Sequence, residues 1–323
     1  MSKPFVLCVL ISDALDNNAS LSFSDLLYGL ERYKDIALNE FNIDIKLIRN
    51  KTTDELINVN EKFDGVISCW GNGIGNNIET FKTSIFIDDC HWWEKWQLTS
   101  RLGLFNKVDI IFTPSYRTLT TYDIYKNIYK EIQHKFVSLY WWAVDECFTF
   151  DMLWKDRKDS ILIYGAFGQC YNLRCAIIKS KHQSIELLNH CGYNDFSHQY
   201  HGSSLLKYLS GFKGGIGTSA NQAATQYDQS IIHPLDYTLK KPFEILGCGA
   251  LGFLEPTKDF DDLGFIPYVH YIPITTDDYD KWDYIKKSDA EDIAKTGMEF
   301  VKNNHSTKNR AITILSTLKE KWL

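Results

Sequence analysis

The chain has 323 residues, a formal net charge of −6, 44% hydrophobic residues and 14% aromatic residues. At about 150 residues per domain, this length predicts two domains, and the apolar content is sufficient for a packed core in each. The negative charge excludes the broad basic surface that is typical of general nucleic-acid binding, although a local basic patch is compatible with it.

The cysteine pattern and the N-terminus indicate the compartment. The 8 cysteines are scattered, without a C-x-x-C pair or the dense spacing of a disulfide scaffold, so we expect reduced thiols. The apolar run at 5–11 lacks a cleavage site and fits a first buried strand better than a signal peptide. No apolar run reaches the roughly 18 residues needed to span a bilayer. These features predict a soluble cytoplasmic protein.

The first half repeats one pattern, in which a short apolar, β-rich run precedes a polar stretch with helical character. The runs lie at 5–11, 43–49, 65–70, 84–88, 108–114 and 136–142. Apolar runs without strict alternation, separated by helices, are typical of a parallel sheet that is buried on both faces. The pattern predicts a doubly wound, Rossmann-like α/β domain.

A charged, irregular segment at 145–159 interrupts this pattern, and we place the domain boundary there. Beyond it the sequence predicts a second Rossmann-like series. Its strands are expected at 160–167, 214–219, 250–256 and 268–274, and its helices at 173–184, 204–211, 241–248, 289–305 and 306–323. The resulting domains are 1–152, 153–305 and a C-terminal helix at 306–323.

Two tandem Rossmann-like domains bind ligands at the carboxyl ends of their strands, so we expect the functional residues in the loops that follow strands. Gly165 and Gly168 follow the strand at 160–167, and Arg174 lies in the first turn of the next helix. Backbone N–H groups and a guanidinium there predict a pyrophosphate site. The spacing G-x-x-G is weaker than a G-x-G-x-x-G fingerprint, so a plain strand-to-helix turn stays an equal alternative.

The segment KPFEILGCGALGFLE, 241–255, carries an acid near the start of a short helix. Glu244 suits a bland helix-start role, since the helix dipole favours an acid there. The functional alternative is that its carboxylate accepts hydrogen bonds from the two vicinal hydroxyls of a ribose, as acids do in Rossmann sites. Lys241, three residues earlier, lies on the same helix face and is placed to approach a phosphate.

Two loops of the first domain are candidates for acceptor binding. Glycines in the 69–79 loop allow a ligand to approach the backbone, and the 86–96 segment ends a strand with acids, a histidine and tryptophans. Asp89 or His91 is the candidate general base, and stacking on a sugar or base is the alternative to core packing for the tryptophans. The candidate acceptor-binding residues are Gly71, Asn72, Gly73, Trp92 and Trp93.

The second half resembles a known family. The run K-x-F-E-I-L-G-C-G-A-L, followed by G-M-E-F-V-K-N-N-H-S-T-K-N-R-A, is similar to the C-terminal half of CgeB-like glycosyltransferases of the GT-B fold. These enzymes carry R-x-F-E-x-x-x-x-G and end with G-x-x-x-V-x-x-x-H-T-x-x-x-R-A. Lys241 stands where arginine is usual and Ser306 where threonine is usual. The run Y-N-L-R likewise resembles the family's Y-P-L-R, with Asn172 in place of proline.

The resemblance implies a donor domain at 153–305, with Glu244 on the ribose of a nucleotide-diphosphate sugar. It also implies that Arg174 and Lys241 offset the diphosphate charge, and that the final helix packs on the N-terminal acceptor domain. Asp236 precedes Glu244 by eight residues, the spacing of E-x7-E in retaining enzymes, but aspartate departs from that pattern, so the stereochemical outcome stays open. The full donor-binding set is Gly165, Gly168, Arg174, Asp236, Lys241, Glu244 and Gly249.

Metal binding is the alternative for two acidic clusters. These are Asp88, Asp89 and His91 at a strand end, and Asp259, Asp261 and Asp262. Neighbours on a strand point to opposite faces, which disfavours convergent ligands. With cationic side chains implied in place of a metal, we expect no metal and no cofactor, only the nucleotide-diphosphate sugar as co-substrate.

The sequence therefore predicts a metal-independent GT-B glycosyltransferase with catalytic candidates Asp89, His91, Arg174 and Lys241. The acceptor stays open among a glycan, a glycolipid, a protein and a modified DNA base, the last without a basic footprint. One alternative is a nucleotide-dependent oxidoreductase, although the turn SDALDNNAS at 12–20 lacks a glycine fingerprint. The other is a non-catalytic nucleotide-sugar binding protein.

Overall fold

The computed structural model describes residues 3–11, 21–58, 62–69, 77–88, 102–165, 172–189, 202–219, 223–225, 228–233 and 238–322. The chain divides into two compact units, one of residues 1–140 with 307–323 and the other of residues 141–306. The segment 141–152 belongs to the second unit. There Ala143 N donates to His305 O over 2.9 Å, and Ala143 and Cys147 pack against Gly247.

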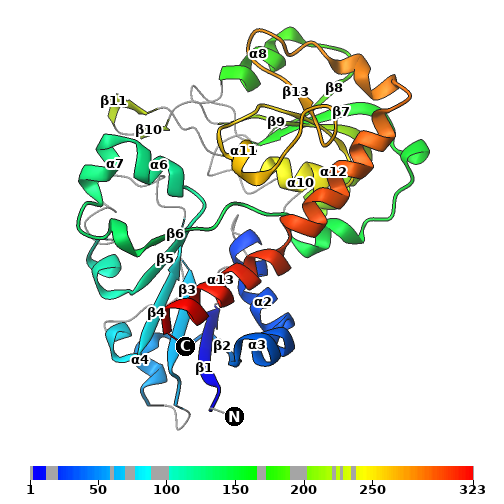
Figure 1. Cartoon of the computed structure of the whole chain (residues 1–323). Helices are drawn as coiled ribbons and strands as arrows, with labels where there is room; N and C mark the ends of the chain where they lie inside the picture. Colours follow the sequence, from blue (N-terminus) through cyan, green and yellow to red (C-terminus); the bar gives the residue numbers. More distant parts are fainter. Residues whose placement is uncertain are drawn as a thin grey trace. The chain divides into compact units, whose positions relative to one another are not determined.

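A six-stranded parallel sheet forms the centre of the first unit, in the order β2-β1-β3-β4-β5-β6 (Figure 1). Its apolar strands are buried on both faces, as their unalternating runs predicted. The strands are β1 Phe5–Ile11, β2 Ile43–Arg49, β3 Gly65–Cys69, β4 Thr83–Ile87, β5 Ile110–Thr113 and β6 Phe136–Ser138.

Helices of the first unit include α2 Leu21–Arg32, α3 Lys34–Phe41, α4 Thr53–Leu56, α6 Tyr116–Thr121 and α7 Asp123–Ile128, with 3₁₀ turns at Ile78–Thr80 and Gln133–Lys135. α4 is short and begins with a capping box between Thr52 and Glu55, which satisfies donors at the start of the helix. An aromatic cluster of Phe105, Tyr129 and Phe136 packs at the β5–β6 end of the sheet.

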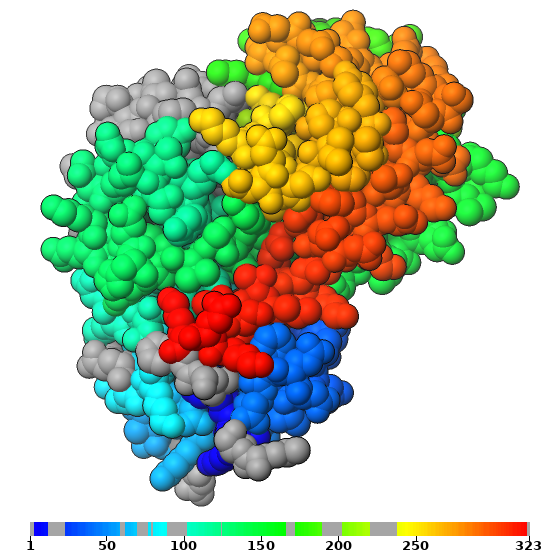
Figure 2. Space-filling view, viewed as in Figure 1, coloured from blue at the N-terminus to red at the C-terminus, as the bar shows by residue number. Residues whose placement is uncertain are grey.

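The C-terminal helix α13, Thr307–Trp322, packs against α2 and α3 (Figure 1). Its buried apolar residues are Ala311, Ile314, Leu315 and Leu318, spaced three and four apart on one helix face. Figure 2 shows this helix in red against the blue surface of α2 and α3. Arg310 Nε donates to Tyr140 O over 2.7 Å, and burial lowers the pKa of this guanidinium to about 10. α13 therefore completes the first unit.

The second unit contains a five-stranded parallel sheet in the order β13-β12-β9-β7-β8. Its strands are β7 Lys158–Gly165, β8 Ile185–Asn189, β9 Phe212–Gly217, β12 Leu251–Leu254 and β13 Ile272–Pro273, and a separate antiparallel hairpin pairs β10 Ala223–Thr225 with β11 Asp228–His233. The hairpin was not expected from the sequence. β13 is shorter than the run at 268–274, because Tyr268 has a φ of 60° and the chain turns there.

Helices of the second unit include α8 Asn172–Ser180, α9 Ser203–Ser210, α10 Lys241–Gly247, α11 Asp259–Leu263 and α12 Ala290–Asn304, with 3₁₀ turns at Asp145–Thr149, Trp154–Asp156 and Trp282–Lys286. α12 is followed by His305, whose Nε2 is 2.9 Å from Leu263 O and whose ring stacks on Phe265. His305 thus makes structural contacts at the end of this helix. No helix in the described ranges has the length and apolar character needed to cross a bilayer.

The strand order of the second unit reverses beside its first strand. Its first strand, β7, has the second strand, β8, on one side and the third, β9, on the other. The chain therefore leaves β7 in one direction and returns on the opposite side, which makes the β7–β9 boundary a topological switch point. In open α/β sheets, ligands bind beyond the carboxyl ends of the strands at this point. The first unit has the same relation among β1, β2 and β3.

Candidate functional site

Arg174 reaches the switch point of the second unit from the first turn of α8. Its side chain is fully buried, and Nε donates to Thr218 Oγ1 over 3.1 Å. Thr218 directly follows β9, whereas α8 follows β7, so this hydrogen bond joins the connections at the ends of the two strands. A buried guanidinium fixed at this place is suited to bind an anion in a planar, two-pronged manner.

Lys241 approaches the same strand end from α10. Its Nζ donates to Tyr164 O over 2.7 Å and lies 5.1 Å from the centre of the Tyr164 ring. Burial, and next the positive charge of Arg174, lower the pKa of Lys241 well below its ordinary value; Glu244 opposes this shift and Lys240 adds to it. The two cations therefore repel each other at a site that an anion would stabilise.

Gly165 explains how the two cations come together. Its φ is +100°, which a residue with a side chain rarely adopts. A Cβ at this position would collide with Lys241 Nζ and would lie 3.6 Å from Arg174 Nη1. Glycine is required here both by the backbone and by the close approach of the two cationic groups.

Glu244 lies in the first turn of α10 and is buried, with 7% of its surface exposed. The Tyr164 hydroxyl donates to Glu244 Oε2 over 2.8 Å, and Lys240 Nζ is 3.4 Å from Oε1. Burial, followed by the Glu244 charge, raises the pKa of Tyr164 well above its usual range, so the phenol stays a donor. The carboxylate is therefore held by β7 and by its own helix.

Tyr164 was not singled out from the sequence. It lies in the apolar strand SILIYGAF, where an aromatic residue is ordinarily read as core. The signal that would have found it is its place at the carboxyl end of the strand, directly before Gly165, where a hydroxyl reaches the ligand-binding edge.

Neighbouring acids stabilise the adjacent strand ends. Glu255 follows β12 and its Oε2 accepts from Ser219 N over 2.8 Å, while Asp259 Oδ2 accepts from Thr238 N over 2.7 Å. Asp259 is fully buried. Its hydrogen bond gives a structural role to one of the acids for which metal binding was the alternative. Across the described ranges, no group of three or more His, Cys, Asp or Glu side chains is placed to hold a metal ion.

Gly249 lies beyond the opposite end of α10 from Lys241. Its φ is +71°, typical of a glycine that ends a helix, and a Cβ there would lie 2.9 Å from Arg157 Nη2. Arg157 Nη1 in turn donates to Cys248 O over 3.1 Å and to Phe212 O over 3.4 Å. These contacts account for the glycine structurally, and its part in donor binding stays a prediction.

Several residues that the sequence nominated lie outside the described residues: Gly71, Asn72, Gly73, Asp89, His91, Trp92, Trp93, Gly168 and Asp236. Their roles stay predictions. Asp88, just before this segment, is buried at the end of β4, and its N donates to Phe112 O over 3.0 Å. Burial and, less strongly, Asp88 raise the pKa of the Cys69 thiol, which is inert as a nucleophile in this state.

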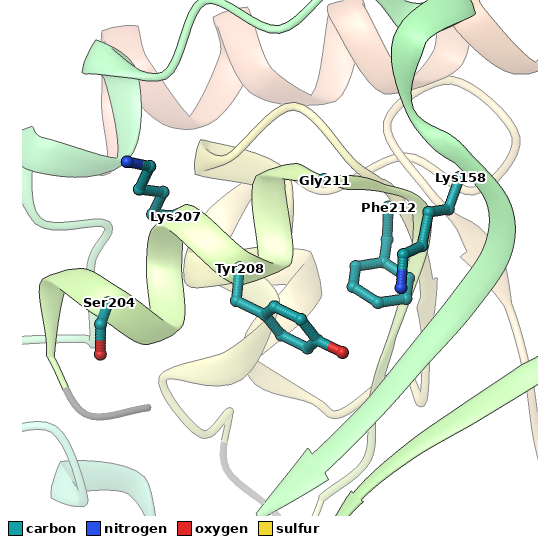
Figure 3. A pocket seen from close by; sticks show the side chains of 6 residues that line it. All are labelled: Lys158, Ser204, Lys207, Tyr208, Gly211 and Phe212. Carbon is teal, nitrogen blue, oxygen red and sulfur yellow. The ribbon is translucent and has the colours of Figure 1, made fainter. Parts of the chain in front are cut away.

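A cavity of about 360 Å³ lies at the opposite end of the second unit's strands from Arg174 and Lys241 (Figure 3). Lys158 and Phe212 in its lining are the first residues of β7 and β9, so it is at the amino ends of the strands. Lys158 Nζ is 3.0 Å from Glu186 Oε2 and 4.7 Å from the centre of the Phe212 ring. The positive charge of Lys158 is already balanced by Glu186. We therefore assign the ligand-binding site to the carboxyl ends of the strands, where the charged groups converge.

Comparison with known proteins identifies the fold. No family model and no curated protein matches the sequence. Among solved structures, HepE from Anabaena, in complex with UDP and glucose, matches with a TM-score of 0.54 at 8% identity, covering 98% of this chain and 100% of that one. An alpha-glucosyltransferase in complex with UDP and a 13-mer DNA containing an HMU base matches with a TM-score of 0.58 at 11% identity, covering 98% and 100%.

Sucrose-phosphate synthase from Thermosynechococcus elongatus also matches, with a TM-score of 0.53 at 7% identity and 98% of each chain covered. These similarities extend over both units of the chain. The predicted α/β fold with two Rossmann-like domains is confirmed, and it is the GT-B fold. At this level of identity the likeness concerns the fold alone.

Proposed function

We propose that the chain is a glycosyltransferase that moves a sugar from a nucleotide-diphosphate sugar to a hydroxyl acceptor, with the donor bound by the second unit. The observation that carries this proposal is the convergence of Arg174, Lys241 and Glu244 around the end of β7. Two cationic groups match a diphosphate, and one carboxylate matches the vicinal hydroxyls of a ribose. The motif resemblance to CgeB-like glycosyltransferases supports the same assignment.

Catalysis in this proposal rests on stabilising the departing diphosphate. Arg174 is fixed by Thr218 before any ligand arrives, so its charge is already oriented toward the leaving group. Lys241 supplies the second positive charge, and the diphosphate would raise its lowered pKa toward the ordinary value. Both side chains act by position and charge, which lowers the barrier without covalent chemistry.

The general base and the acceptor belong to the first unit in this proposal. Asp89 and His91 remain the candidate bases for an inverting reaction, and Asp89→Asn and His91→Ala variants test them. The acceptor is a hydroxyl of a glycan, a glycolipid, a protein or a modified DNA base. One of the similar structures holds DNA, but the net charge of −6 favours the first three classes.

Thermal unfolding with nucleotides tests the donor assignment. We expect one nucleoside diphosphate among UDP, GDP, ADP and dTDP to raise the melting temperature, since a ligand at about 100 times its Kd adds about 2.7 kcal/mol to the free energy of unfolding. The increase should persist in EDTA and disappear in Glu244→Ala. A shift with NAD but none with these nucleotides would instead support the oxidoreductase alternative.

A second experiment separates an enzyme from a binding protein. The purified chain is incubated with the stabilising nucleotide's sugar conjugate and a mixed acceptor panel, and release of the nucleoside diphosphate is measured. Release that depends on an acceptor is expected for a transferase. Tight binding of the conjugate without release would favour the non-catalytic nucleotide-sugar binding protein.

A further inference from the structure

Tyr164 and Glu244 form a buried pair beside the switch point of the second unit's sheet. Tyr164 is 2% exposed and lies at the carboxyl end of β7, and its hydroxyl donates to Glu244 Oε2 over 2.8 Å. The two residues are 80 positions apart, so the contact joins α10 to the strand that carries Gly165. A hydrogen bond from a buried phenol to a carboxylate is stronger than one between neutral groups.

The pair leaves the carboxylate able to bind a ligand. An ionised carboxylate has about four acceptor positions, of which the Tyr164 hydroxyl occupies one. Lys240 Nζ approaches the other oxygen at 3.4 Å from a side chain that is 36% exposed, so it restrains the carboxylate more weakly. The remaining acceptor positions suffice for two hydroxyl donors.

The torsion that orients a carboxylate is broad, so a glutamate held only at its stem presents its oxygens in many directions. Two vicinal hydroxyls require both acceptors in one plane and one direction. We infer that Tyr164 positions the Glu244 carboxylate for the 2′- and 3′-hydroxyls of a ribose, and thereby sets the preference of the site for ribonucleotides over 2′-deoxyribonucleotides. This inference rests on the proposed function and assigns Tyr164 as a positioning residue.

The test uses the nucleoside diphosphate that raises the melting temperature, for which UDP stands below, and compares its dissociation constant with that of its 2′-deoxy counterpart by calorimetry. We expect the wild-type chain to bind UDP about tenfold more tightly, the factor typical of one hydrogen bond to a charged group. In Tyr164→Phe, UDP affinity should fall about tenfold, and the affinity of 2′-deoxy-UDP, which keeps only the 3′-hydroxyl contact, should fall by less, so the ratio of the two constants moves toward one. A residue with only a structural role would weaken both nucleotides equally.

A double-mutant cycle identifies the route of the effect. Glu244→Ala should abolish the preference for UDP, and adding Tyr164→Phe to it should change the ratio no further, because Tyr164 acts through the carboxylate. Tyr271→Phe is the matched control: Tyr271 is equally buried in the same unit, and Asp261 is the charge near its hydroxyl. This variant should retain the wild-type ratio.

The outcomes are separable. A wild-type chain that prefers UDP, with an unchanged ratio in a folded Tyr164→Phe variant, overturns the inference and leaves the proposed function intact. A wild-type chain that binds the two nucleotides equally, or that binds only dTDP among the four nucleoside diphosphates, also overturns it. Binding of none of UDP, GDP, ADP and dTDP overturns the proposed function and this inference with it. The melting temperature of each variant without ligand verifies folding.

Discussion

Two like charges beside one glycine define the chemistry of the site at the scale of single residues. Arg174 and Lys241 lie against the same side of Gly165, and each raises the cost of charging the other. Such an arrangement is unfavourable in the ligand-free protein and becomes favourable when an anion lies between the groups. The stability that this site lacks without ligand is thus recovered on binding.

Lys241 gives the site a pH dependence. Its folded-state pKa lies below its unfolded value, so unfolding takes up a proton between the two, and ligand-free stability rises with pH across that interval. Affinity for UDP, or for whichever nucleoside diphosphate the melting experiment identifies, should move the opposite way, falling as pH rises, because the anion needs the charged amine. Calorimetric titrations between about pH 6 and about pH 10 measure it.

Lys241→Arg provides the control for this prediction, since a guanidinium stays charged across the whole interval. The variant should retain its UDP affinity at the alkaline end, where the wild-type affinity falls. If both proteins show the same pH profile, titration of Lys241 does not govern binding.

Gly165→Ala should weaken UDP binding by at least about tenfold and destabilise the second unit by about 1–3 kcal/mol. The backbone is left-handed, and the new Cβ would displace Lys241 Nζ. Gly103→Ala is the control, because a Cβ there meets nothing within 4 Å. Unaltered UDP binding in Gly165→Ala would contradict the close approach of the two cations. Chemical denaturation and calorimetry provide both values.

The sequence predicted part of this arrangement. Gly165, Arg174, Lys241 and Glu244 were nominated from their places after strands, and the structure brings them to one strand end. Tyr164 was missed because the sequence does not distinguish a tyrosine that only packs in the core from one whose hydroxyl also makes a hydrogen bond. Which partner a buried polar atom finds 80 residues away is decided by packing and has no local signal.

At the scale of elements, the apolar runs located the parallel strands other than β8, because strands buried on both faces carry continuous apolar sequence. The strand β8, Ile185–Asn189, was not predicted. The hairpin of β10 and β11 was not predicted, since its short strands carry polar residues such as Gln229 and His233. The run at 268–274 was read as one strand, but the φ of 60° at Tyr268 interrupts it. The turn at this position therefore overrides the strand propensity of the run.

Arg157 connects three elements at the amino edge of the second sheet. Arg157→Ala should lower the free energy of unfolding by about 2–4 kcal/mol, because the carbonyls of Cys248 and Phe212 lose a buried charged donor. UDP affinity should stay unchanged, since these contacts are remote from the strand carboxyl ends. Denaturant unfolding measures the loss of stability, with Lys155→Ala at an exposed position as the control. Equal free energies of unfolding for the two variants would contradict the prediction.

At the scale of the whole molecule, length predicted two domains, and the structure has two compact units. The apolar face of 306–323 predicted a packed helix but could not identify its partner, because an amphipathic pattern fits any apolar surface. The resemblance implied that it packs on the first domain. The chain leaves the first unit after Tyr140, where no change of composition marks the sequence.

Leu315→Ala should affect the two units differently. Leu315 is fully buried in α13, so its truncation should destabilise the first unit by about 2–5 kcal/mol. In scanning calorimetry we expect one transition to move down while the transition that UDP raises stays in place. Displacement of both transitions by the same amount would show that the units unfold as one.

The discontinuous first unit has a consequence for biosynthesis. Residues 307–323 are synthesised after 141–306, so the apolar surface of α2 and α3 stays uncovered while all of 141–306 is made. We therefore expect the second unit to fold before the first, the reverse of the usual order in which the N-terminal domain folds first during translation. In proteolysis of stalled nascent chains, the second unit should become protected before the first. The first unit would need chaperones until α13 emerges.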